Sequence, residues 1–308
     1  MTNETQSAKG YGPASMGNFS VAFDVIGVGL TNPGDTVTAV KTSKKKDVEI
    51  ICISGDGGKL SKDPNKNTAG VTAAGLLEAV DADFGVTLSV EKGIPLGSGL
   101  GSSAASATAA LVAVNALLKD PLKKNDLIPF AIEAEFAACG ARHADNVAPS
   151  LLGGVVMITS YEPLRVYKLP IESSLWVATV TPEIEVNTKD ARAALPANIP
   201  LSIASTQLGL FGGALHGLLQ DDELIIEQHL VDLLVEPYRK QFIPEFDTHK
   251  EAALDAGALA FGISGAGPTV FALCKDEKVA LSCSEKIKYS FQEISIESTP
   301  YTLSLIHI

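Results

Sequence analysis

An uncharged, glycine-rich stretch at residues 95–110 contains the residue types that could bind a phosphate. Its sequence is PLGSGLGSSAASATAA, with a glycine at every second position from 97 to 101 and then a run of small residues. Glycine lets the backbone turn sharply and approach a ligand closely. Backbone N–H groups at a helix N-terminus lack intrahelical partners and carry partial positive charge, so they suit an anion, above all a phosphate.

The hydroxyls of Ser98, Ser102 and Ser103 could also contact phosphate oxygens or a metal ion. An ordinary strand-to-helix turn would explain the glycines alone, but glycines, serines and an uncharged helix start coincide here. We therefore interpret the stretch as a phosphate-binding loop. The candidate nucleotide-binding residues are Pro95, Leu96, Gly97, Ser98, Gly99, Leu100, Gly101, Ser102, Ser103, Ala104 and Ala105.

The loop differs from the two commonest nucleotide-binding motifs. A Walker A loop has a lysine after its last glycine, whereas Ser102 follows Gly101 here. A Rossmann fingerprint needs GxGxxG and an acidic residue about 20 positions further on, at the end of the next strand. Asp120 lies at about that distance, but it follows a predicted helix and precedes Pro121. A Rossmann-type dehydrogenase is therefore excluded.

Other polar residues could bind a ligand or act in catalysis, but each of them could equally have a purely structural role. Glu135 could be a hard oxygen ligand for Mg²⁺ or a solvated glutamate on a helix face. The segment from His143 to Asn146 could bind a substrate or form a helix-capping turn, which Asp and Asn favour. Arg192 and Arg239 have the donor fork that matches a carboxylate, and either could instead form a salt bridge at the surface.

The elements that must position these residues alternate between strands and helices in both halves of the chain. Strand patterns precede the loop at 20–30, 36–40, 47–55 and 84–94, and helical spacing occurs at 68–80, within 102–119 and up to Gly140. In the second half, strands are predicted at 175–182 and on either side of a Gly-rich turn within 259–274. Helices are predicted at 205–219, 222–234, 249–258 and 278–294. The pattern indicates an α+β (mixed α/β) protein of two domains.

Composition and charge narrow the function classes. The chain has 308 residues and a formal net charge of −12, so nucleic-acid binding would need a local basic patch. The only basic run, at 44–46, has no interleaved aromatic residues and is interpreted as a solvated turn. The four cysteines show neither CxxC nor zinc-ligand spacing, and no signal peptide or membrane span is apparent. We therefore expect a cytoplasmic protein that binds neither nucleic acid nor membrane.

Three motifs in order resemble those of the GHMP small-molecule kinases. PLGSGLGSSAA is similar to the second signature of that family, residues 13–30 (PASMGNFSVAFDVIGVGL) resemble the first, and residues 262–273 (GISGAGPTVFAL) resemble the third. The resemblance implies ATP and Mg²⁺ as cofactors and the two-domain GHMP kinase fold. It places a nucleotide-binding domain at residues 1–168 and a ferredoxin-like domain at residues 169–308.

Further segments resemble the homoserine kinase branch of that family. RHADNVAPSLLGG at 142–154 and EPYRKQFIPEF at 236–246 are similar to its characteristic segments. Asn18 and Asp24 match its N-x5-D pattern, although NFSVAFD differs in its middle from the commoner NLGPGFD. The resemblance implies L-homoserine as the phosphate acceptor, in threonine biosynthesis, and a homodimer.

The resemblance also implies roles for individual residues. Ser103 and Glu135 would hold the metal ion, and Glu135 and Asn146 would be the catalytic residues. Asn146 is neutral and cannot take a proton, so positioning and charge stabilisation would carry the reaction. Ser264 and Gly265 would lie near the active site in a structural role. The residues implied for homoserine binding are Asn18, Asp24, His143, Asp145, Arg192 and Arg239.

Two alternatives remain open from the sequence. Another GHMP kinase, of the mevalonate or shikimate type, would share the glycine loop, but the HADN segment and Arg239 favour an amino-acid acceptor. A catalytically silent protein of the same fold would be expected to lack the loop or Glu135, and both are present.

Overall fold

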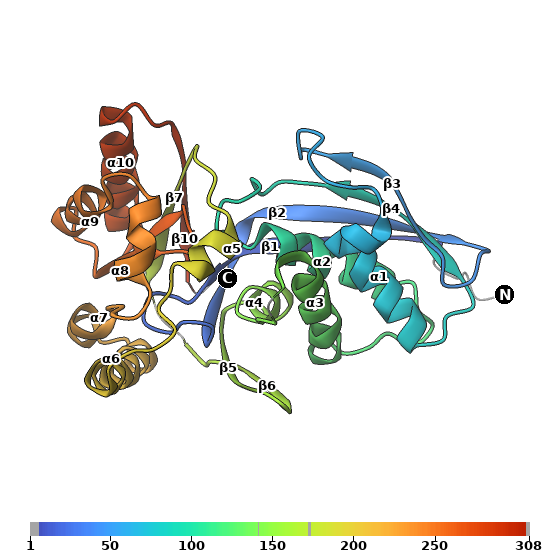
Figure 1. Ribbon diagram of the computed structural model, residues 1–308, viewed down its shortest axis with the longest axis horizontal. Coiled ribbons are helices and arrows are strands. Elements are labelled where there is room, and N and C mark those ends of the chain that lie inside the picture. The colour runs from blue at the N-terminus through green and yellow to red at the C-terminus, as the bar shows by residue number, and fades with distance from the viewer. Residues whose placement is uncertain (1–5, 141, 172–173, 306–308) are drawn as a thin grey trace. The chain divides into compact units, whose positions relative to one another are not determined.

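The computed structural model describes residues 6–140, 142–171 and 174–305 (Figure 1). Contacts within the chain define two compact units that alternate along the sequence. Unit 1 comprises the residues up to Ser15 together with Gly29–Leu96 and Gly101–Gly153. Unit 2 comprises Met16–Val28, Gly97–Leu100 and the residues from Gly154 onward. The glycine loop therefore contributes residues to both units.

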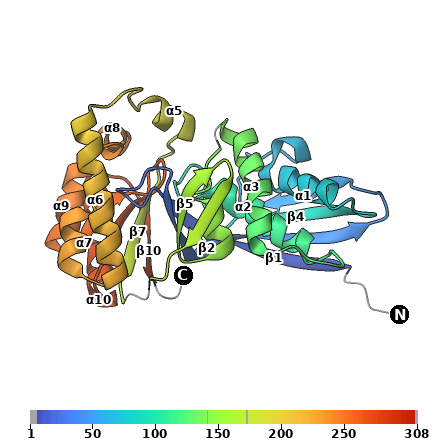
Figure 2. The ribbon, with the colours of Figure 1, turned by 90° about the horizontal axis from the view of Figure 1, so that it is seen from below.

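Unit 1 contains a sheet in the order β3-β4-β2, and β1 pairs with β2. β4 is antiparallel to β2 and parallel to β3. The helices α1, α2 and α3 pack against one another, and α1 and α2 contact the sheet (Figure 2). The elements are β1 (Ser7–Gly17), β2 (Ile26–Thr42), β3 (Val48–Ser54), η1 (Pro64–Lys66), α1 (Thr68–Ala79), β4 (Gly85–Glu91), α2 (Ser102–Asn115), α3 (Lys124–Cys139) and α4 (Val147–Leu152).

Helix α2 is the central helix of unit 1, and its small side chains explain how it fits there. Ten of its residues, from Ala104 to Val114, are buried, and six of these are alanines (Ala104, Ala105, Ala107, Ala109, Ala110 and Ala113). Alanine has the highest helix propensity and little bulk, so the helix can form without a polar face and can pack closely. The glycine loop is therefore connected to a rigid, buried helix.

Unit 2 contains a four-stranded sheet in the order β10-β7-β9-β8, in which all neighbours are antiparallel. Because α10 connects β9 to β10 and the earlier helices connect β7 to β8, the order is that of a ferredoxin-like βαββαβ unit. Helices α9 and α10 pack together, and their buried side chains form one apolar core with those of the sheet. The elements of this sheet and its packed helices are β7 (Trp176–Pro182), α9 (Phe246–Asp255), β8 (Ala260–Ile263), β9 (Val270–Cys274), α10 (Glu277–Glu293) and β10 (Ser298–Ser304).

The remaining elements of unit 2 precede or connect these strands. β5 pairs antiparallel with the first residues of β2 and with β6. Their bounds are β5 (Val155–Tyr161), β6 (Leu164–Lys168), α5 (Thr188–Ala193), α6 (Leu201–Gln220), α7 (Glu223–His229), α8 (Glu236–Arg239) and η2 (Lys240–Phe242). None of the helices in the described residues combines the length and apolarity needed to cross a membrane.

The mixed α/β fold is confirmed, two predicted elements need correction, and the strand β10 was missed. The strand predicted at 20–30 begins only at Ile26, because several residues before it have left-handed backbone, including Asn18 and Asp24. The helix predicted from residue 222 ends at His229, where Leu230 leaves helical geometry. β10 was not predicted, yet it pairs with β7 along seven residues, from Ser298 opposite Pro182 to Ser304 opposite Trp176.

Candidate active site

The glycine loop has left-handed backbone at each of its three glycines. The φ angles are +66° at Gly97, +83° at Gly99 and +65° at Gly101. Residues that carry a Cβ rarely adopt positive φ angles, which explains why these alternate positions are glycine. Helix α2 begins directly after the loop at Ser102, and no acidic residue occupies its first turn. The positive end of the helix is therefore not neutralised by its own side chains, an arrangement that suits an anion.

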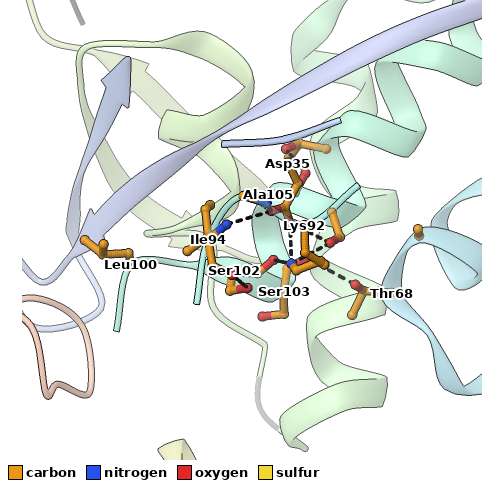
Figure 3. Close-up of polar contacts among 12 residues, drawn as sticks. Asp35, Thr68, Lys92, Ile94, Leu100, Ser102, Ser103 and Ala105 are labelled. Carbon is orange, nitrogen blue, oxygen red and sulfur yellow. Dashed lines mark hydrogen bonds and ion pairs between the residues drawn. The ribbon is translucent and has the colours of Figure 1, made fainter. Parts of the chain in front are cut away.

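The three serine hydroxyls of the loop have different partners. Ser98 is buried, and its Oγ accepts a backbone N–H within the loop at 3.4 Å. The Ser102 hydroxyl donates to the Ile94 carbonyl at 3.2 Å (Figure 3). Ser103 forms a hydrogen bond with the Glu135 carboxyl group. The structure therefore brings Ser103 to the other predicted metal ligand, whereas Ser98 and Ser102 form contacts that shape the loop.

Within unit 2, the third motif holds loop residues 97–100 in place. The Ser264 hydroxyl donates to the Gly99 carbonyl at 2.8 Å. Thr269 donates to the Ser98 carbonyl twice, from its N–H at 3.0 Å and from its hydroxyl at 2.7 Å. These contacts involve side chains and backbone on both segments. The conformation of the glycine loop therefore depends on the segment from Ser264 to Thr269.

Glu135 lies buried on α3 in unit 1, together with two other predicted site residues. Burial raises the pKa of the Glu135 carboxyl, while nearby His143, the hydrogen bond from Ser103 and the charge of Lys92 oppose this rise. His143 and Asp145 are also buried, with Nδ1 and Oδ1 3.6 Å apart. Glu135 is therefore not the solvated surface glutamate that the sequence left open.

Asn146 lies at the start of α4 and beside the last glycine of the loop. The Ser15 hydroxyl donates to its Oδ1 at 3.0 Å. A Cβ built on Gly101 would lie 2.9 Å from the same Oδ1 and would also meet the Ser15 Oγ. Three segments of unit 1, at residues 15, 101 and 146, therefore meet at one point, which fixes the Asn146 amide at the start of α2.

The predicted acceptor residues in unit 2 gather around an aromatic side chain, Phe23. Asp24 accepts a forked pair of hydrogen bonds from Arg192, with Nη2 2.9 Å from Oδ1 and Nη1 3.1 Å from Oδ2. The guanidinium carbons of Arg192 and Arg239 lie 5.2 Å and 5.3 Å from the centroid of the Phe23 ring. Both distances fall within the range of a cation–π contact. Two guanidinium groups thus lie against a single ring, and one of them is paired with the Asp24 carboxylate.

Arg239 is buried, and hydrogen bonds fix its orientation. Its Nη1 donates to the Gly265 carbonyl at 2.7 Å, and its Nε donates to the Ala191 carbonyl at 3.4 Å. The Asn18 amide nitrogen donates to the same Gly265 carbonyl at 2.9 Å. Asn18, Asp24, Arg192 and Arg239 are therefore brought together in unit 2, whereas the other predicted acceptor residues, His143 and Asp145, belong to unit 1.

Sequence reasoning missed a buried ion pair in unit 1, between Lys92 and Asp35. Lys92 follows β4 directly, and Asp35 lies within β2. In the sequence, the lysine follows a strand in EKG and the aspartate follows NPG, and both contexts are typical of solvated turns. Burial lowers the pKa of the Lys92 ammonium group, and the Asp35 carboxylate opposes this effect. No signal in the sequence distinguishes this pair from surface charges.

Family models match both parts of the chain. The model of the GHMP kinases N terminal domain matches residues 67–154, and that of the GHMP kinases C terminal matches residues 214–292. A homoserine kinase of Chlorobium phaeovibrioides is 42% identical over 93% of this chain and 92% of its own length. The chain belongs to the homoserine kinase family of GHMP kinases. A homoserine kinase of Xylella fastidiosa belongs to the same family, at 35% identity over 97% of this chain and 92% of its own length.

Solved structures agree with this family membership. The crystal structure of a homoserine kinase from Cytophaga hutchinsonii has a TM-score of 0.95 and 45% identity, and the match covers 99% of this chain and 96% of that one. The crystal structure of L. major mevalonate kinase in complex with R-mevalonate has a TM-score of 0.69 at 15% identity over 99% of both chains, and shows the shared fold alone.

Proposed function

We propose that this protein is an ATP-dependent homoserine kinase that transfers the γ-phosphoryl group of ATP to the hydroxyl of L-homoserine, giving O-phospho-L-homoserine for threonine biosynthesis. The observation that carries the proposal is the group of Asp24, Arg192 and Arg239 around Phe23. An amino-acid acceptor is a zwitterion, and this group offers guanidinium donors for its carboxylate and a carboxylate for its ammonium. The names of the relatives support the same acceptor.

We assign the nucleotide phosphates to the glycine loop and the first turn of α2. Mg²⁺ fits the pair of Ser103 and Glu135, because both supply the hard oxygen atoms that this ion prefers. Among the described residues, no group of three or more His, Cys, Asp or Glu side chains could hold a metal ion. One carboxylate and one hydroxyl are nevertheless enough, since Mg²⁺ in kinases is bound by one or two protein ligands with substrate phosphates and water. When bound, the ion would neutralise charge on the phosphate oxygens.

Alignment and electrostatics, rather than a general base, would carry the transfer. Asn146 has a neutral amide whose Oδ1 already accepts a hydrogen bond from Ser15, so it can orient a hydroxyl but cannot take its proton. The acceptor hydroxyl would then lose its proton late, to a phosphate oxygen. Phosphoryl transfer tolerates this order because its transition state is loose and depends mainly on positioning. We also assign His143 and Asp145 to acceptor binding.

The wider setting is also part of the proposal. We infer a cytoplasmic homodimer without nucleic-acid binding, in which residues 1–168 and 169–308 form the nucleotide-binding and C-terminal domains. The net charge of −12 supports the exclusion of nucleic acid, because an acidic surface repels the phosphate backbone.

The decisive experiment is an ADP-release assay with the purified protein and four acceptors: L-homoserine, mevalonate, galactose and shikimate. We expect kcat/KM for homoserine to exceed that of the other three by at least about 100-fold, because a site built for charged groups strongly rejects an acceptor that leaves them unpaired. Equal or better turnover of mevalonate would contradict the proposal. Nucleotide binding without turnover of any acceptor would favour a silent binding protein instead.

A further inference from the structure

The buried ion pair of Lys92 and Asp35 lies beside the beginning of α2 in unit 1 (Figure 3). The side chains are only 1% and 0% exposed. Lys92 Nζ also donates to the Ser102 carbonyl and to the Ser106 hydroxyl, each at 2.8 Å. Ser102 and Ser106 belong to the first two turns of α2. The lysine therefore connects the end of β4 to the beginning of the helix.

The hydrogen bonds of this pair form a complete set. The three N–H donors of the Lys92 ammonium meet Asp35 Oδ2, the Ser102 carbonyl and the Ser106 hydroxyl. The Ser106 hydroxyl donates in turn to Asp35 Oδ2 at 2.7 Å. Asp35 Oδ1 accepts the N–H groups of Gly93 at 2.9 Å and Ile94 at 3.2 Å. Every donor has an acceptor, which satisfies the condition under which buried charges are tolerated.

The network joins the two ends of the glycine loop. Asp35 holds Gly93 and Ile94, which precede the loop, while Lys92 holds Ser102, which follows it. The Ser102 hydroxyl closes the same link by donating to the Ile94 carbonyl. Residues 95–101 therefore start and end at points that are fixed to one another. A change in the ion pair would be transmitted to both ends of the loop.

We propose that Lys92 and Asp35 are positioning residues that set the geometry of the glycine loop and the first turn of α2 for nucleotide phosphates. The inference rests on the proposed function only in taking a nucleotide as the ligand of the loop. Neither side chain is exposed enough to be the main phosphate contact. Their effect on binding passes through Gly93, Ile94, Ser102 and Ser106.

Stability alone does not account for this placement. A buried ion pair is weak evidence for stability, since apolar residues of similar size often serve as well. The Lys92 ammonium also sits at the N-terminal end of α2, where the helix dipole disfavours a cation. The same position is favourable once an anion binds at that end. The placement thus makes sense for a loop that receives phosphate groups.

The test compares the affinities for MgADP and for adenosine, measured by calorimetry on the full chain. Adenosine lacks phosphates, so a positioning role in phosphate binding affects MgADP but not adenosine. The variants are Lys92→Met, which removes the ammonium at similar length, and Ser106→Ala, which removes one bridging hydroxyl. Lys46→Met is the matched control, because Lys46 in the same unit pairs with Glu78 and Asp81 near the surface.

We expect Lys92→Met to weaken MgADP binding at least tenfold and adenosine binding less than twofold. Ser106→Ala should weaken MgADP binding about threefold with adenosine again unchanged, and it gives the same comparison if Lys92→Met does not fold. Wild-type affinity for MgADP in the folded variants, or an equal loss for MgADP and adenosine, would overturn the inference. MgADP binding does not depend on the acceptor. Failure of homoserine turnover by the unchanged protein would therefore refute the proposed function separately.

Discussion

Replacing Gly99 by alanine perturbs the glycine loop at a position where the nearest neighbours of the new Cβ would all be backbone atoms. The φ angle there is +83°, and a Cβ would lie 2.6 Å from the carbonyl oxygens of both Ser264 and Gly267. Both neighbours are backbone atoms, so no flexible side chain can move aside. Gly257→Ala is a matched control within unit 2. Its φ is +97°, but its Cβ would meet only Val279 Cγ1, at an ordinary 3.4 Å.

The expected magnitudes follow from these two environments. An alanine at positive φ costs about 1–2 kcal/mol, partly offset by about 0.4–1 kcal/mol because it reduces the entropy of the unfolded chain. Both variants carry this cost. Gly99→Ala must also move the two oxygens by about 0.8 Å, the difference between 3.4 Å and 2.6 Å. Such overpacking typically costs about 1–3 kcal/mol more. We expect losses of about 2–4 kcal/mol for Gly99→Ala and about 1 kcal/mol for Gly257→Ala.

Two assays distinguish a phosphate-binding loop from a purely structural turn. Thermal unfolding should show Tm lower by roughly 4–16 °C in Gly99→Ala, taking about 2–4 °C per kcal/mol. Steady-state kinetics should show kcat/KM for ATP reduced about 10- to 100-fold, because misplacement of about 1 Å at a reacting centre can cost 100-fold. Gly257→Ala should retain wild-type kinetics. A Gly99→Ala variant with lower Tm but unchanged ATP kinetics would refute the reasoning, since the loop would then be structural only.

Three further predictions concern other residues. Glu135→Gln should lower kcat roughly 100-fold at ordinary Mg²⁺ concentrations, because it removes a charged oxygen ligand of the metal ion. Glu133→Gln, on the exposed face of the same helix, is the control and should leave kcat unchanged. Arg239→Lys should raise the KM for homoserine at least about tenfold, because lysine lacks the planar guanidinium group that can donate two hydrogen bonds to a carboxylate. The exposed Arg165→Lys is the control, and equal KM values for the two variants would contradict a role for Arg239. Burial lowers the pKa of His249 below its value of about 6.5 in the unfolded chain. The contribution of neutral His249 to the stability of the folded protein is therefore full above pH 6.5, and it is lost as the pH falls from there through the folded pKa. The free energy of unfolding should then fall by up to about 1.4 kcal/mol per pH unit more in the unchanged protein than in His249→Gln, and identical slopes would contradict this assignment.

The parts of the site that were predictable from the sequence depend on local rules. Alternating glycines before an alanine-rich segment indicate a positive-φ loop and a buried helix, and residues 97–115 show both. The burial of Glu135 could not be predicted, because hydrophobic periodicity identifies a helix but not how deeply each of its faces is buried. That burial depends on the elements that pack against α3. Lys92 and Asp35 were missed because 57 residues separate them. Only the pairing of β2 with β4 brings their surroundings together.

The difference between local sequence patterns and tertiary pairing also explains why β10 was not predicted. Its segment, STPYTLS, carries a proline, which weakens the pattern of a central strand. β10 is an edge strand that pairs only with β7 in the described sheet order, so Pro300 can be accommodated there. The order β10-β7-β9-β8 is a tertiary property that depends on the whole of unit 2. Local propensity could not supply it.

The departure of NFSVAFD from the commoner NLGPGFD shows which features of the acceptor segment matter. Asn18, Phe19 and Ser20 have positive φ without being glycine, at a cost of order 1–3 kcal/mol each. The side chain of Phe19 offsets this cost, because it is fully buried and stacks on Phe271 with ring centroids 5.5 Å apart. The ends of the segment stay joined, since the Asp24 N–H donates to Asn18 Oδ1 at 3.0 Å. The middle residues can therefore vary, provided that packing maintains the turn and Asn18 still presents Asp24 to Arg192.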